Sequence, residues 1–75
     1  MTNASHEYIQ ISDLQKTRPT VTVLESGSRE YIQSQIDYDV KMWRKAGGEV
    51  IENEDGSISL NEADGREKYQ LYIKF

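Results

Sequence analysis

The chain has 75 residues, a formal net charge of -4, no cysteine, and 36% hydrophobic residues. This length predicts one domain with one modest core. Because the chain has no cysteine, neither disulfides nor cysteine-ligated zinc can stabilise that core, and a homodimer is a remaining source of stability. The acidic balance disfavours general nucleic-acid binding, which depends on clustered Lys and Arg. The lack of cysteine favours a cytoplasmic location, and no apolar run is long enough to cross a membrane.

The N-terminal part predicts two strands after a short tail. Residues 1–7 are polar and are expected to be a disordered tail, which leaves residues 8–75 as a single α+β domain. Residues 8–11 and 20–24 are rich in alternating and β-branched side chains and predict strands. Between them, the spacing of Ser12 and Gln15 is that of a capping box and predicts one helical turn over residues 12–16.

The most regular segment predicts an amphipathic helix. It begins after Ser28, a favourable N-cap residue, and it ends before Gly47 and Gly48. Apolar residues recur at spacings of four, four and three, which places them on one stripe that faces a core. The residues of this core stripe are Ile32, Ile36, Val40 and Trp43.

After the helix, the apolar period changes to two. Asp55-Gly56 and Asp64-Gly65 each predict a tight reversal between strands, and Tyr69, Leu71, Ile73 and Phe75 are expected on the buried face of a final strand. The expected fold is therefore ββαβββ, with one helix on an antiparallel sheet and a C-terminal meander of three strands. A calcium loop over residues 51–62 is disfavoured, because Ile51 occupies the position of its first ligand.

Little in the sequence indicates catalysis, and we expect neither enzyme activity nor a cofactor or metal. The single histidine, His6, falls in the predicted tail, and there is no cysteine nucleophile or phosphate-binding glycine loop. Asp39 is unusual because it falls inside the apolar stripe. Its carboxylate either reaches the edge of the stripe or accepts a hydrogen bond from a nearby Tyr or Lys, makes a polar contact in an interface, or marks a small ligand or active site.

Two features indicate protein binding. Tyr31, Tyr38 and Met42 form a second stripe beside the core stripe, which is either the rim of a broad core or a contact with a partner or second copy. The segment from Glu49 to Asp64 contains only acidic charges, among which Glu52, Glu54 and Asp55 are the candidates for binding a basic surface; the alternative is a solvated hairpin.

The favoured hypothesis is a small acidic protein-binding module, such as a phage or mobile-element inhibitor or regulator of a nucleic-acid-handling host protein. The alternative is a homodimeric regulator that binds nucleic acid through the basic end of the helix and the connection between the two N-terminal strands. The residues of this alternative site are Lys16, Arg18, Lys41, Arg44 and Lys45.

Overall fold

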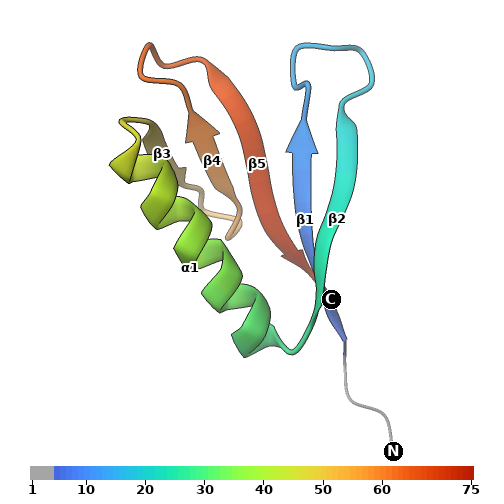
Figure 1. The fold of residues 1–75 in the computed structure, drawn as a ribbon. Coiled ribbons are helices and arrows are strands. Elements are labelled where there is room, and N and C mark those ends of the chain that lie inside the picture. The colour runs from blue at the N-terminus through green and yellow to red at the C-terminus, as the bar shows by residue number, and fades with distance from the viewer. Residues whose placement is uncertain (1–4) are drawn as a thin grey trace, which may run out of the picture.

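The structure is a computed structural model that describes residues 5–75. In this range the chain forms one helix and one five-stranded antiparallel sheet with the strand order β2-β1-β5-β4-β3 (Figure 1). The elements are β1 (His6–Ser12), β2 (Thr20–Gly27), α1 (Arg29–Lys45), β3 (Glu49–Glu52), β4 (Ile58–Asn61) and β5 (Glu67–Lys74). The predicted α+β class, the order ββαβββ and the C-terminal meander are confirmed.

The helix α1 forms where its capping and apolar residues predict it. The Ser28 hydroxyl accepts a hydrogen bond from the Tyr31 backbone N–H at 3.2 Å, which satisfies a free donor of the first turn. At the other end, Gly47 adopts a φ of 94°, a conformation that favours glycine and stops the helix. The buried residues of α1 are Ile32, Ile36 and Val40, as predicted.

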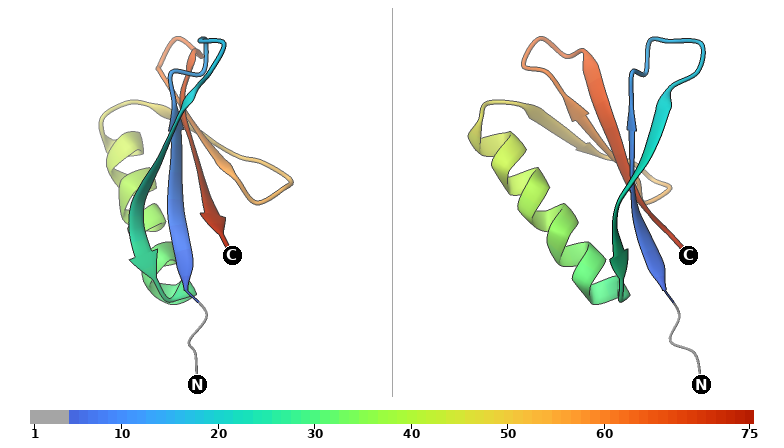
Figure 2. Two further views of the ribbon diagram at one scale, coloured as in Figure 1. Left: turned by 90° about the vertical axis from the view of Figure 1, so that its right-hand side faces the viewer. Right: turned by 45° about the vertical axis from the view of Figure 1, so that its right-hand side comes forward.

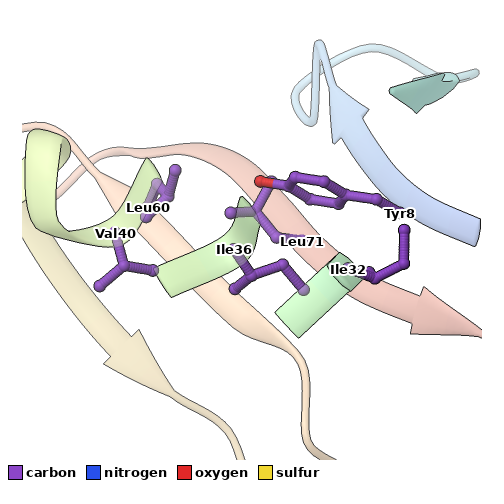
Figure 3. Packing of buried hydrophobic residues seen from close by; sticks show 6 residues of the cluster. All are labelled: Tyr8, Ile32, Ile36, Val40, Leu60 and Leu71. Atoms are coloured by element: carbon purple, nitrogen blue, oxygen red, sulfur yellow. The ribbon is translucent and has the colours of Figure 1, made fainter. Parts of the chain in front are cut away.

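The core lies between α1 and one face of the sheet (Figure 3). Trp43, the last member of the predicted stripe, packs against it. Its indole N–H donates to the backbone carbonyl of Asn61 at 2.8 Å, and its ring meets Tyr69 edge-on with the centroids 5.8 Å apart. The buried cluster consists of Tyr8, Ile32, Ile36, Val40, Leu60 and Leu71.

The two Asp-Gly pairs form chain reversals of the same construction, as predicted. In the turn between β3 and β4, the Asn53 N–H donates to the Ser57 carbonyl, and in the turn between β4 and β5 the Glu62 N–H donates to the Arg66 carbonyl. Both glycines adopt positive φ, 91° at Gly56 and 92° in the second turn. The segment considered as a calcium loop is therefore a β-hairpin.

The first strand is longer at both ends than the sequence predicts. It begins at His6, so two residues of the expected tail belong to the folded domain, whereas residues 1–4 lie outside the described residues. It continues to Ser12, which pairs with Thr20 of β2, and the predicted helical turn over residues 12–16 is wrong. The chain instead reverses through a turn in which the Lys16 N–H donates to the Asp13 carbonyl.

Two further boundaries differ from the prediction. The second strand does not end at Leu24 but continues to Gly27, because a bulge at Leu24 lets the pairing with β1 resume beyond it. Phe75 follows β5 and is 80% exposed, so it is not a core residue. Its ring meets the ring of His6 edge-on at 4.8 Å, which places this histidine beside the end of β5.

The helix covers one face of the sheet, and the other face, here called the open face, has no helix over it (Figure 2), although Ile9 on that face is only 2% exposed. Tyr8 points under α1, and side chains alternate along a strand, so Ile9 and Ile11 lie on the opposite face. Their direct partners in β2 are Val23 and Val21. Figure 2 shows α1 on one side of the sheet only. The two isoleucines and two valines thus form an apolar group on the face away from the helix.

Candidate functional site

The second stripe of α1 is exposed. Tyr31 is 43% exposed, Tyr38 60% and Met42 41%, although all three belong to a helix whose neighbouring stripe is buried. These side chains therefore lie at the surface of the helix and outside the buried cluster. We refer to Tyr31, Tyr38 and Met42 as the helix flank.

The helix flank lies on the side of α1 that faces β1 and β2. The Tyr31 ring packs against Gly27 at the end of β2, where an added Cβ would lie 3.1 Å from the ring. On the same side, the Asp39 carboxylate accepts a hydrogen bond from Tyr8 of β1. The opposite side of α1 faces β3, because Asp37 and Glu52 line one groove of about 400 Å³.

Asp39 has a structural partner. The Tyr8 hydroxyl donates to its Oδ2 atom at 2.6 Å, and the Tyr8 side chain is among the most buried of the described residues. Burial of the phenol, followed by the hydrogen bond to Asp39, raises the pKa of Tyr8 well above its ordinary value of 10.0. Of the roles considered for Asp39, the hydrogen bond from a nearby tyrosine is the one that the structure shows.

The three acidic candidates lie together at the β3–β4 hairpin. Glu52 ends β3, and Glu54 and Asp55 are in the following turn, where their side chains are exposed. The Asp55 carboxylate accepts hydrogen bonds from the hydroxyl and the backbone N–H of Ser57, at 2.6 and 2.9 Å, and these bonds lower the pKa of Asp55. Asp55 is thus held ionised in a fixed turn.

The acidic segment does not form a single surface. The turn between β4 and β5, which carries Glu62 and Asp64, lies at the end of β4 opposite to the β3–β4 turn (Figure 1). Both of its carboxylates have cationic neighbours, since Asp64 contacts Arg66 at 3.0 Å and Glu62 approaches Lys68 at 3.9 Å. The helix flank and the β3–β4 hairpin likewise lie on opposite sides of α1.

The five basic candidates for nucleic-acid binding are divided between two elements. Lys16 and Arg18 are in the connection between β1 and β2, and the Lys16 ammonium group lies 3.9 Å from Asp13. Lys41 and Arg44 line the groove that also contains Glu52, on the β3 side of the helix. The acidic turn between β4 and β5 separates the two groups in the view of Figure 1. The structure therefore does not gather them into one basic patch.

Sequence patterns identified candidate surface residues on the helix but did not identify the exposed apolar residues on the open face of the sheet. Val21 is 61% exposed and Val23 49% exposed on this face, beside Ile9 and Ile11. The signal was the succession of two apolar residues, Tyr8 and Ile9, within one strand. Because neighbouring residues of a strand point to opposite faces, such a pair places apolar side chains on both faces of the sheet.

Within residues 5–75, no group of three His, Cys, Asp or Glu side chains is arranged to hold a metal ion. In the same range, α1 lacks the length and apolar character needed to cross a membrane. Comparisons with protein-family models, with curated proteins and with solved structures find no similar protein.

Proposed function

We propose that this chain is a small protein-binding module that contacts its partner through the helix flank and favours a partner with a basic surface. The observation that carries the proposal is the exposure of Tyr31, Tyr38 and Met42 in one row on a helix that the core holds in place. Tyr and Met are enriched at protein interfaces, and a rigid helix presents them without a further ordering cost.

The charge of the chain supports a basic partner. The net charge is -4, and the β3–β4 hairpin presents Glu52, Glu54 and an ionised Asp55 at an exposed turn. Since this hairpin and the helix flank lie on opposite sides of α1, we assign them different tasks. The flank makes the contact, and the hairpin attracts a positively charged surface and speeds encounter. An inhibitor or regulator of a protein that handles nucleic acid would meet such a surface.

The experiment is quantitative affinity capture from lysates, with and without nuclease, using matched variants. A flank variant, Tyr38→Ala with Met42→Ala, is compared with Ile51→Ala and Phe75→Ala, which removes exposed apolar side chains elsewhere. We expect a protein that the wild type and the control variant retain after nuclease treatment and that the flank variant loses. Retention by the flank variant, or loss on nuclease treatment alone, would contradict the proposal; the second outcome favours the nucleic-acid alternative.

Binding kinetics with the captured protein separate the two tasks. Glu52→Lys with Glu54→Lys and the control Glu62→Lys with Glu67→Lys both bring the net charge from -4 to zero. The first variant should lower the association rate and reduce its dependence on salt, whereas the flank variant should mainly raise the dissociation rate. Equal association rates for the two charge variants would show that the hairpin has no special part in encounter.

A further inference from the structure

A groove lies between α1 and the β3–β4 hairpin, on the side of α1 opposite to the helix flank. Its volume is about 400 Å³, and its apolar lining consists of Val40 and Ile58, which are part of the core or pack against it. A smaller hollow of about 180 Å³ shares Ile58 and Glu52 with the groove and therefore adjoins it. The core residues Ile36 and Leu71 line this hollow. Together, the groove and the hollow offer a small apolar group space next to the core.

Four charged side chains line the groove, and they are separated along it. Lys41 and Arg44 lie toward the C-terminal end of α1, Asp37 lies earlier on the helix, and Glu52 of β3 borders both the groove and the adjoining hollow. Within residues 5–75, no ion pair of 4.0 Å or less involves any of the four. Asp37 accepts a hydrogen bond only from the neutral amide of Gln33, at 3.0 Å. The cationic end and the acidic end of the groove therefore do not neutralise each other directly.

The spacing of the charges determines the length of a ligand that contacts both ends. At a rise of about 1.5 Å per residue, Asp37 is about 6 Å from Lys41 and about 10 Å from Arg44 along the helix axis. A single amino acid separates its ammonium and carboxylate groups by about one residue length, roughly 3.5 Å, whereas two residues span roughly 7 Å. The separation therefore matches a dipeptide better than a single amino acid.

We propose that the groove binds a dipeptide that has free ends and apolar side chains. The dipeptide carboxylate binds Lys41 and Arg44. The ammonium group binds Asp37 and Glu52, and the side chains pack on Ile58 and in the adjoining hollow. Charge complementarity identifies the ligand as a zwitterion, because two cations and two carboxylates give no advantage to a ligand of either net charge. This inference goes beyond the proposed function, since it concerns a small molecule on the other side of α1, and Glu52 is the one residue that both use.

A titration followed by NMR tests the proposal with four probes: leucyl-leucine, its N-acetylated form, its C-terminal amide and glycyl-glycine. We expect leucyl-leucine to bind with a dissociation constant of about 0.2–1 mM, a range that its size sets. Each blocked form lacks one charged end and should bind about fivefold more weakly. Glycyl-glycine keeps both charges but has no apolar side chain, so it should not bind measurably.

Matched variants identify the groups that bind the carboxylate. Lys41→Gln with Arg44→Gln, and the control Lys16→Gln with Lys45→Gln, each remove two cations and change the net charge from -4 to -6. Neither control residue lines the groove. The groove variant should bind leucyl-leucine about fivefold more weakly and should bind the C-terminal amide, which has no carboxylate, as the wild type does. The control variant should bind both as the wild type does.

The signals that shift in the titration give the position of the ligand. We expect shifts in residues 33–44 and 52–58, which border the groove and the hollow, and none centred on the helix flank. The proposal would be overturned by the absence of leucyl-leucine binding at about 10 mM. Equal affinities for the free and blocked dipeptides, equal effects of the two double variants, or shifts centred elsewhere would also overturn it.

Discussion

The Tyr8 hydroxyl donates a hydrogen bond of 2.6 Å to the Asp39 carboxylate and so joins the inner strand β1 to the middle of α1. The two residues are 31 positions apart in the chain. The phenol is buried, while the carboxylate lies at the border between the core and the helix flank. This bond satisfies the buried Tyr8 hydroxyl and one oxygen of the half-buried Asp39 carboxylate.

Replacing Tyr8 with phenylalanine should destabilise the fold while leaving its apolar packing intact. The substitution removes the donor to Asp39 and leaves a half-buried carboxylate without it, at a cost of about 1–3 kcal/mol in the free energy of unfolding. Urea denaturation followed by circular dichroism measures this difference. Tyr38→Phe, at an exposed position, serves as the control and should change the free energy of unfolding by less than about 0.5 kcal/mol.

Alkaline pH should weaken the fold through the same residue. The pKa of Tyr8 is higher in the folded chain than in the unfolded chain, so the neutral phenol is favoured by folding. Its contribution to stability is complete below the unfolded pKa and decreases as the pH rises above about 10. Urea denaturation at increasing pH should therefore show that the free energies of unfolding of the wild type and Tyr8→Phe become more similar. A constant difference up to about pH 11 would contradict this linkage.

Gly48 is expected to tolerate no larger residue. A Cβ at this position would lie 2.1 Å from the Trp43 Nε1 atom, so Gly48→Ala must displace the indole from its hydrogen bond to the Asn61 carbonyl. We expect a loss of about 1–3 kcal/mol and a shift in the emission of Trp43, the single tryptophan of the chain. Gly47→Ala meets no neighbouring atoms and should change stability only through its positive φ, without altering the emission.

Acid should weaken the two Asp-Gly turns. The hydrogen bonds from Ser57 lower the pKa of Asp55, and those from Arg66 lower the pKa of Asp64, from an ordinary value of 3.8. The ionised forms are favoured by folding, so their contributions are present above the unfolded pKa and decrease as the pH falls below about 4. Thermal unfolding should show that the unfolding temperature of the wild type decreases as the pH falls. The double variant Asp55→Ala with Asp64→Ala should show a smaller decrease over the same pH range.

The sequence predicted those parts of the fold that local chemistry determines. The capping hydroxyl of Ser28, the helical spacing of the core stripe and the two Asp-Gly turns act over a few residues, and each appears as predicted. The helical turn after Ser12 failed because a local capping pattern competed with strand pairing to Thr20, a contact that spacing along the chain does not encode. Tertiary pairing prevailed over local propensity.

The residues of the candidate surfaces could be predicted from the sequence, but their arrangement in space could not. The helical period identified Tyr31, Tyr38 and Met42 as a second stripe, yet only the packing of α1 on the sheet decides that this stripe is exposed. Proximity in sequence also grouped Glu52 with Asp64, which β4 carries to opposite ends of the sheet. Strand order determines such relations, and it depends on contacts between distant segments.

The position of β1 and β5 at adjacent places in the sheet has a consequence for the rate of folding. The β1–β2 hairpin and the β3–β4–β5 meander each consist of contacts between neighbouring segments, which form quickly. Their junction pairs Glu7 with Lys74, and closing so long a loop carries a large entropic cost. We therefore expect the β1–β5 ladder to form last.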